Sequence, residues 1–313
     1  SAKSPAVLQS LDNDSNVRGK INENYGRELL ELHTVGADNG YTQQDVFEAA
    51  RVFTGWSIVT LREDAVNGGT FVYRPRAHDE DAKTVMGLRI PARGGMKDGE
   101  ALLDFLAAHP STARTISLKL CRRFIADEPA EAVVSAGAAA FTASKGDIKA
   151  TLGSILHSPE FKASSGQKIK RPLEFVASAL RAVDADTTAE PRIQQALAGM
   201  GQPLFLWQPP NGFPDTAGAY LGASSFLARW NFALNLASAA YKETKVKFDT
   251  LAGKGDLIDA LAQRLYGGTL PPSVKSALQP FTSGRQTPQL VALMLCAPLF
   301  QVRWRWNVTR ALA

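Results

Sequence analysis

Cysteine and histidine are scarce in this chain of 313 residues, which holds two cysteines and four histidines. The two cysteines, Cys121 and Cys296, form no Cys-x-x-Cys pair, so the sequence contains no thiolate zinc motif. Both lie in apolar stretches with a helical pattern, either as buried free thiols or as the two halves of one disulfide bridge. Two cysteines in a chain of this length decide nothing about the redox compartment.

Long apolar runs are also missing. No stretch reaches the roughly 18 consecutive apolar residues of a membrane-spanning helix, so we expect no membrane span. Several motifs that identify an enzyme class from sequence are absent as well, namely His-Glu-x-x-His, the P-loop, the dinucleotide fingerprint and the Gly-x-Ser-x-Gly elbow. No complete motif therefore names a reaction.

Positive charge is in slight excess and is spread along the chain, with a formal net charge of +5 and a pI of about 9.2. The densest basic clusters are Lys119-Arg122-Arg123 and Lys168-Lys170-Arg171. Neither has the glycine and aromatic pattern of a nucleic-acid module, so we expect no nucleic-acid partner. A weak attraction to an anionic polymer or to a membrane surface stays open.

The spacing of apolar residues predicts helices over most of the chain. One of them, over 42–56, starts with Thr42-Gln43-Gln44-Asp45, which is close to a capping box. Between 57 and 91, short β-branched and aromatic runs replace the helical pattern, with a turn at Asn67-Gly68. We therefore predict a mainly α, multi-helix globular fold, a single domain over 1–313, with a small two- or three-stranded β insertion at about 57–91.

A first helix is predicted over residues 20–34. At 100° per residue its apolar stripe falls within roughly 80° of arc and consists of Ile21, Tyr25, Leu29 and Leu32. Gly26 borders this stripe and costs about 1 kcal/mol in a helix interior relative to alanine. We expect another element to pack closely against it.

The same helix carries acidic residues that are candidates for chemistry. Glu31 and Arg27 belong to a charged ladder on the far side, where each pair contributes only about 0.3–0.5 kcal/mol, typical of a solvated face. Glu28 lies at the border of the apolar stripe, where a half-buried carboxylate needs a partner. Glu28 and Glu31 are therefore candidate catalytic acids or bases, and Arg27 is a candidate for binding an anionic group.

A second acidic cluster, His78 to Lys83, follows a predicted strand. His78 with Asp79 suits a metal ligand with its orienting carboxylate, or a general base with its partner. Lys83 suits the binding of a substrate anion. The alternative is a solvated turn with capping carboxylates.

Asp12 and Asp14 precede the first helix and give a weak candidate for a metal site. Together with Asn16 and Glu23 they match several ligand positions of an EF-hand loop, but Val17 stands where that loop requires glycine. We do not predict an EF-hand, and a different calcium contact by either aspartate stays open.

The stretch 200–215 is a loop of prolines, glycines and aromatic residues. Trp207, Asn211 and Phe213 are candidate ligand-binding residues, because stiff extended segments with exposed rings bind sugars and peptides by stacking. The alternative is a connector whose rings fill the core between helices.

Several segments of the chain resemble a bacterial family, the domain of unknown function numbered eighteen hundred. The matching residues are Leu11-Asp12-Asn13, Asn22-Glu23-Asn24, Arg27-Glu28-Leu29-Leu30-Glu31-Leu32, Gly40-Tyr41-Thr42 and Thr54-Gly55-Trp56. A His-Asp-x-Gly-x-Lys segment of the family resembles His78, Asp79 and Lys83. The chain departs from the family pattern at Gly26, where alanine is usual, and at Asp81, which replaces the glycine.

This resemblance implies a cellular setting but no activity. Family members are usually longer and often carry export signals, so we expect the C-terminal part of a longer product that is periplasmic or secreted. Their genes often lie beside genes for a sulfatase-like family, which makes such a protein a candidate partner.

Two functions of different classes follow from these residues. The first is a cell-envelope binding protein that holds a glycan, a peptide or a partner protein on the aromatic loop. The alternative is a metal-assisted hydrolase or lyase that uses Glu28, His78 and Asp79 with a divalent metal as cofactor. The alternative requires Glu28 to lie within reach of His78 or Asp12 in a cleft.

Overall fold

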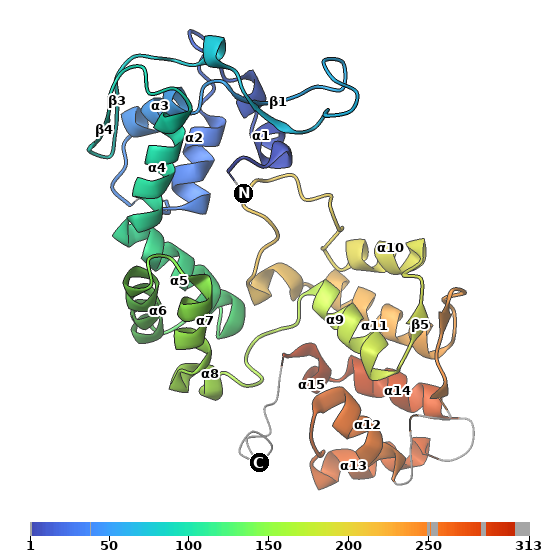
Figure 1. The fold of residues 1–313 in the computed structure, drawn as a ribbon. Helices are drawn as coiled ribbons and strands as arrows, with labels where there is room; N and C mark the ends of the chain where they lie inside the picture. Colours follow the sequence, from blue (N-terminus) through green and yellow to red (C-terminus); the bar gives the residue numbers. More distant parts are fainter. Residues whose placement is uncertain (1, 38, 249–250, 252–255, 283–285, 304–313) are drawn as a thin grey trace. The chain divides into compact units, whose positions relative to one another are not determined.

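A computed structural model describes residues 2–37, 39–248, 251, 256–282 and 286–303. The predicted mainly α fold is confirmed, since helices dominate and the strands form only two-stranded sheets. The chain groups into two compact units (Figure 1), unit 1 with residues 1–121 and 130–155, and unit 2 with residues 122–129 and 156–313. Each unit has its own hydrophobic core. The single domain expected from the sequence stays a prediction.

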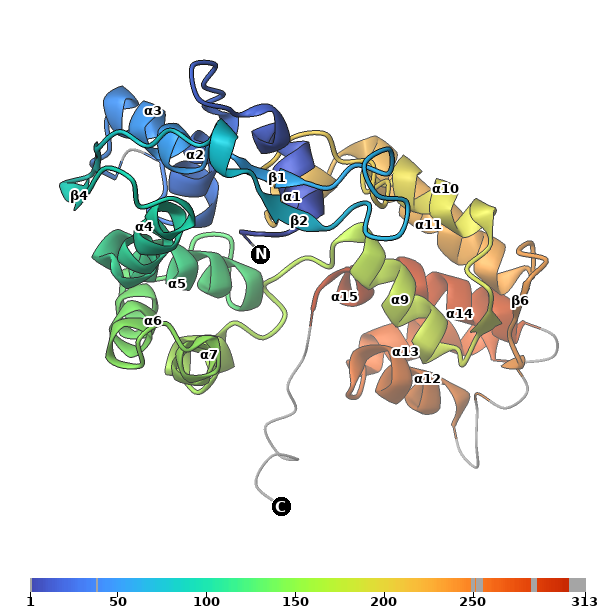
Figure 2. The same cartoon turned by 45° about the horizontal axis from the view of Figure 1, so that its top comes forward.

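Unit 1 contains helices α1 to α7 and the four strands of the β insertion. Its elements are α1 (Pro5–Ser10), a 3-10 turn (Asn13–Ser15), α2 (Asn24–Glu28), a π turn (Leu29–His33), α3 (Gln43–Val52), β1 (Trp56–Ile58), β2 (Phe71–Tyr73), a 3-10 turn (Pro75–Ala77), β3 (Lys83–Val85), β4 (Leu88–Ile90), α4 (Met96–Ala108), α5 (Pro110–Phe124), α6 (Glu131–Ala143) and α7 (Ile148–Leu156). Helices α2, α3 and α4 lie side by side, and α5 to α7 form a second group (Figures 1 and 2).

Unit 2 contains helices α8 to α15 and one short strand pair. Its elements are α8 (Pro159–Ala163), α9 (Pro172–Ala182), β5 (Asp186–Thr187), α10 (Pro191–Gly199), a 3-10 turn (Ala217–Tyr220), α11 (Ala223–Ala237), β6 (Thr244–Lys245), α12 (Leu257–Tyr266), α13 (Pro272–Leu278), a 3-10 turn (Gln279–Phe281), α14 (Thr287–Cys296) and α15 (Pro298–Gln301). The short β5–β6 pair was not predicted, because two residues per strand leave no alternating pattern to detect.

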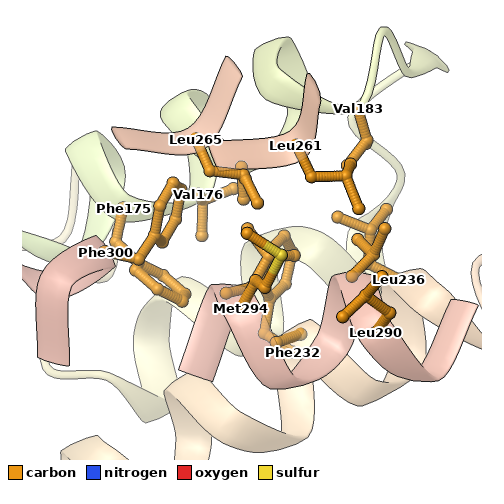
Figure 3. Close-up of a cluster of buried hydrophobic side chains, with 14 of the residues drawn as sticks. Phe175, Val176, Val183, Phe232, Leu236, Leu261, Leu265, Leu290, Met294 and Phe300 are labelled. Carbon is orange, nitrogen blue, oxygen red and sulfur yellow. The ribbon is translucent and has the colours of Figure 1, made fainter. Parts of the chain in front are cut away.

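The core of unit 2 lies between α9, α11, α12 and α14 (Figure 3). Each helix contributes apolar residues at helical spacing, and the largest contributors are Phe175, Val176, Phe232, Leu236, Leu261, Leu265, Leu290 and Met294. Phe300 of α15 covers one end of this core and packs edge-on against Phe175, with 5.6 Å between the ring centroids. Complete burial of such side chains contributes about 1.5–3 kcal/mol each, which makes this core the main stabilising feature of unit 2.

The core of unit 1 is organised around α3. The predicted capping box is confirmed, because Thr42 Oγ1 accepts from Asp45 N at 3.2 Å while Thr42 N donates to Asp45 Oδ2 at 2.8 Å. Beyond the end of α3, the rings of Phe53 and Trp56 pack edge-on with 5.1 Å between their centroids. Both side chains are fully buried, so the residues that directly follow α3 belong to the core of unit 1.

The β insertion consists of two separate hairpins. Strand β1 pairs with β2, and β3 pairs with β4, both antiparallel. The structure thus has four strands where the sequence predicted two or three. The predicted turn residues Asn67 and Gly68 lie in the connection from β1 to β2, and the second hairpin turns at Met86 and Gly87, both with positive φ.

The first predicted helix is shorter and less regular than expected over 20–34. It begins at Asn24, whose backbone N–H donates to the side chain of Asn22 at 3.0 Å. From Leu29 to His33 it widens into a π turn, a feature that apolar spacing does not indicate. Lys119 Nζ donates to the carbonyl of Leu32 and so satisfies one of the free carbonyls at this end.

Neither cysteine takes part in a disulfide bridge, so the disulfide alternative is wrong. Cys121 is buried in unit 1 and Cys296 is half-buried in unit 2. Among the residues that the structure describes, no helix is both long and apolar enough to span a bilayer.

Gly26 provides a test of the packing in unit 1, because α3 approaches it closely as expected. A Cβ at Gly26 would lie 2.8 Å from Ala50 N and 3.1 Å from Val46 O, and both are backbone atoms. We predict that Gly26→Ala lowers the free energy of unfolding by about 1–3 kcal/mol, although alanine favours helix. Urea denaturation measures this change.

The matched control is Gly199→Ala in α10, where the new Cβ would meet only Ala228 Cβ at 3.8 Å, an ordinary contact. This variant is expected to keep or raise stability by up to about 1 kcal/mol. A stabilising effect of Gly26→Ala would show that α2 and α3 can separate without cost.

Candidate functional site

The predicted residues His78, Asp79 and Lys83 lie close together in unit 1, but they are buried. His78 Nδ1 lies 2.8 Å from the carbonyl oxygen of Thr54, and Nε2 lies 3.2 Å from Asp98 Oδ2. Lys83 Nζ donates to the same Asp98 oxygen at 2.8 Å. The side chains of His78 and Lys83 are both 0% exposed, so the solvated-turn alternative is wrong for them.

The hydrogen-bond geometry shows how His78 is held. The Thr54 carbonyl can only accept, so His78 Nδ1 donates to it. His78 Nε2 faces the Asp98 oxygen that also accepts from Lys83 Nζ, so the histidine and the lysine share one carboxylate oxygen.

Asp79 points away from this group and forms an ion pair with Arg51 of α3. Arg51 Nε lies 2.8 Å from Asp79 Oδ2, and Arg51 Nη2 lies 3.1 Å from Oδ1. Burial is the largest single influence on Asp79 and raises its pKa, but the hydrogen bonds from Arg51 and from the Asp81 backbone, together with the charges of Arg51 and Lys83, lower the pKa below its ordinary value. Asp79 is therefore an ionised partner of an arginine, with both oxygens engaged.

The acidic residues of the first helix lie elsewhere in unit 1. Burial, followed by the charge of Glu31, raises the pKa of Glu28. Within the described residues, the Glu28 carboxylate makes no hydrogen bond or ion pair with His78 or Asp12. Arg27 pairs with Glu23 at 2.9 Å, as the ladder predicts. The structure does not bring these candidates together with the histidine.

Two buried asparagines lie beside Asp12 and Asp14, Asn13 between them and Asn16 two residues after Asp14. Asp12 has a left-handed backbone (φ 56°) and accepts a long hydrogen bond of 3.4 Å from Asn24. Asn13 and Asn16 are buried, and their amides donate to backbone carbonyls of the segment that contains the end of α3. Through these hydrogen bonds, residues 12–16 hold the C-terminal end of α3 in place. In the part of the chain that the structure describes, no three His, Cys, Asp or Glu side chains are grouped to hold a metal.

The aromatic loop lies in unit 2, and its rings are arranged in two ways. Trp207 and Phe213 pack with 4.9 Å between centroids, and Trp207 Nε1 donates to Asn211 Oδ1 at 3.1 Å. The three predicted ligand-binding residues thus form one local cluster. Phe205 is different, since it is 98% exposed and has φ +62°, a conformation that costs a non-glycine residue energy.

A group of charged side chains holds the far end of this loop. Asp215 lies 3.2 Å from Arg123, and its carbonyl accepts from Lys168. Glu174, in the first turn of α9, lies 2.6 Å from Arg303 and 2.7 Å from Arg123. We call this group the charged cluster; its members are Arg123, Asp127, Lys168, Lys170, Arg171, Glu174, Asp215, Arg229 and Arg303.

Two cations of the charged cluster lack a carboxylate partner among the described residues. Arg229 is 0% exposed, donates to Lys170 O and Gln301 Oε1, and leaves its Nε without an acceptor. Lys170 Nζ lies 3.5 Å from the Phe300 ring centroid. Burial, followed by repulsion from Arg229, lowers the pKa of Lys170 to about 8, and burial lowers that of Arg229 to about 10.

Comparison with known proteins identifies the family. Residues 1–302 match the family model described as protein of unknown function (DUF1800), so the chain belongs to this family. No curated protein and no solved structure matches the chain. The family resemblance drawn from the motif residues is thus confirmed, and it brings no activity with it.

The buried Asp98 provides a stability test for the group in unit 1. Asp98→Asn removes the charge that partners Lys83, and loss of one partner of a buried pair costs about 3–5 kcal/mol. We predict a loss of this size in the free energy of unfolding, measured by urea denaturation. The control is Glu100→Gln in the same helix, which breaks an exposed pair with Lys3 and should cost less than about 1 kcal/mol. Equal effects of the two variants would contradict the buried pair.

Lys170 provides a pH test for unit 2. Its pKa is about 8 in the folded protein and near 10.5 ordinarily, so between these values the unfolded chain binds more protons. Stability due to this residue therefore rises with pH over that window. We predict that the wild type gains stability relative to Lys170→Met between pH 8 and 10.5. Comparison with the variant cancels other titrating groups, such as Cys296.

The control for this pH test is Lys242→Met, which removes an exposed lysine of the same unit. Its stability is expected to follow that of the wild type over the whole range. Parallel curves for the wild type and Lys170→Met would show that Lys170 keeps an ordinary, solvated ammonium.

Proposed function

We propose that this DUF1800 chain is a non-catalytic binding protein of the cell envelope, periplasmic or secreted. Its ligand, a glycan, a peptide or a partner protein, binds on the aromatic loop of unit 2, residues 200–215. The observation that carries the proposal is the exposed Phe205, whose backbone is held in a left-handed conformation.

Phe205 supports binding because its side chain contributes nothing to the core, and leaving it exposed to water is energetically unfavourable. A phenylalanine that is 98% exposed forgoes the favourable free energy of burial, which is about 1.5–3 kcal/mol. Leu206 beside it is 68% exposed. Strained backbone in a loop concentrates at sites where a ligand is held, and exposed apolar groups mark interaction surfaces.

The rest of the loop supports binding because it is ordered before any ligand arrives. The hydrogen bond from Trp207 to Asn211 and the packing of Trp207 on Phe213 fix the loop internally. Asp215 fixes its end to the charged cluster. A preformed surface loses less conformational entropy on binding, so more of the contact energy appears as affinity.

The alternative, a metal-assisted hydrolase or lyase with a divalent metal, has less support. Arg51 occupies both oxygens of Asp79, and His78 lies in a fully buried group with Asp98. A substrate would have to open this group to reach either residue. Glu28 and Glu31 make no ion pair with either residue in the described parts of the chain.

The location and the partner are proposed from the family resemblance. Family members that carry export signals support a location in the periplasm or outside the cell, and a sulfatase-like protein encoded nearby is the proposed partner. The absence of a membrane-spanning helix among the described residues is compatible with several locations and adds no support.

The loop gives a direct test of the proposal. We predict that Phe205→Ala and Trp207→Ala each weaken binding by about fivefold or more, which corresponds to 1 kcal/mol for a contact that contributes strongly. Biolayer interferometry against immobilised polysaccharides, peptides and cell-envelope extracts measures the affinity. Val66→Ala is the control, because Val66 is also an exposed apolar side chain but lies in unit 1. Unchanged binding in both loop variants, to every ligand that binds the wild type, would contradict the proposal.

A further inference from the structure

The charged cluster of unit 2 has more cations than carboxylates. Six cations, Arg123, Lys168, Lys170, Arg171, Arg229 and Arg303, surround three carboxylates, Asp127, Glu174 and Asp215. Six positive and three negative charges leave a formal excess of three. Because part of the cluster is buried, this excess is only weakly screened by solvent and acts as a local attraction for anions.

Hydrogen-bond capacity is in excess as well as charge. Arg171 Nε lies 3.4 Å from a Glu174 oxygen and 3.7 Å from an Asp215 oxygen, at or beyond the limit of a hydrogen bond. Among the described residues, neither this buried Nε nor that of Arg229 has a hydrogen-bond acceptor. Buried donors without acceptors are rare in folded proteins, so the carboxylates described in the cluster do not fully satisfy these two guanidinium groups.

The cluster is open to solvent on the side of Arg123 and Arg171. Their side chains are 32% and 22% exposed, whereas Arg229 is fully buried. An anion can therefore contact Arg123 and Arg171 directly, while Arg229 attracts it through its charge alone. Guanidinium groups bind carboxylate, sulfate and phosphate oxygens through paired N–H donors.

The aromatic loop leads directly into the cluster. Phe213 lies two residues before Asp215, so their Cα atoms are at most about 7 Å apart. Asp215 is the residue that Arg123 and Arg171 share. A single extended ligand can thus lie on the rings of Trp207 and Phe213 and place a charged group on the arginines.

We propose that the ligand of the loop is an acidic polysaccharide, whose carboxylate, sulfate or phosphate groups bind Arg123 and Arg171 while its sugar rings pack on the aromatic side chains. This inference rests on the proposed binding function of the loop. Trp207 is half-buried and directs its only polar atom to Asn211, so the rest of its ring is apolar, and sugar rings stack on apolar aromatic rings. The three carboxylates interrupt the positive charge of the cluster, unlike the uniformly basic face that binds a membrane.

The test measures binding of four polymers by biolayer interferometry. They are a polyuronate, heparin as a sulfated polysaccharide, neutral dextran and polyglutamate. We expect polyuronate or heparin to bind at least tenfold more tightly than dextran and polyglutamate, and to weaken as salt is raised from 0.05 to about 0.5 M. Arg171→Gln should weaken this binding at least fivefold, and Phe205→Ala should weaken it as well.

Matched variants separate the cluster from overall charge. Lys242→Met removes one positive charge from an exposed site of unit 2 and should leave the affinity for the acidic polysaccharide within twofold. Far-ultraviolet circular dichroism and the melting temperature show whether Arg171→Gln is folded. Arg123→Gln takes its place if it is not, because Arg123 is the more exposed of the two side chains.

The outcomes distinguish this inference from the proposed function. Equal binding of dextran and polyuronate, lost in Phe205→Ala, would overturn the acidic ligand and leave the binding loop intact. Tighter binding of polyglutamate or of anionic lipid vesicles would overturn the polysaccharide. Binding of heparin that weakens equally in Lys242→Met and Arg171→Gln would show a general charge effect and would overturn the site.

Discussion

In each unit, one carboxylate in the first turn of a helix pairs with cations that come from segments distant in sequence. Asp98 in α4 receives Lys83 and His78, and Glu174 in α9 receives Arg303 and Arg123. The positive end of the helix dipole stabilises an anion at that position before any side chain arrives. The resulting ion pairs attach segments that are distant in sequence to these two helices. The packing of each unit therefore depends on one carboxylate.

The features that the sequence predicted are those controlled by near neighbours. Thr42 and Asp45 are three residues apart, and their capping box forms as predicted because both partners belong to one turn of helix. The close approach at Gly26 was predicted because an unfavourable residue in a helix interior needs a reason. The loop containing Trp207 and Asn211 was identified from local composition, and its internal hydrogen bond joins residues four apart.

The features that the sequence did not predict depend on distant partners. Asp98 lies 20 residues after His78, and no local pattern connects a helix-start aspartate to a histidine in an earlier turn. The sequence offered His78 and Asp79 as partners because they are adjacent, whereas the structure turns them toward different residues, Asp98 and Arg51. The π turn after Glu28 was also missed, since apolar spacing cannot distinguish it from the end of an α-helix. The candidate sites were therefore located by sequence as segments, but not as sets of contacting atoms.

The two charged groups contain similar residues, and the balance of donors and acceptors gives them different properties. Around Asp98, the donors of Lys83 and His78 all meet oxygen acceptors, and the group is closed to solvent. Around Glu174, the buried Nε atoms of Arg171 and Arg229 have no acceptor among the described residues, and the side chains of Arg123 and Arg171 are partly exposed. A group whose donors are all satisfied stabilises the fold and offers a ligand no free donor, whereas an excess of partly exposed cations attracts anions. The charged cluster of unit 2 is therefore a better candidate for ligand binding than the histidine motif of unit 1.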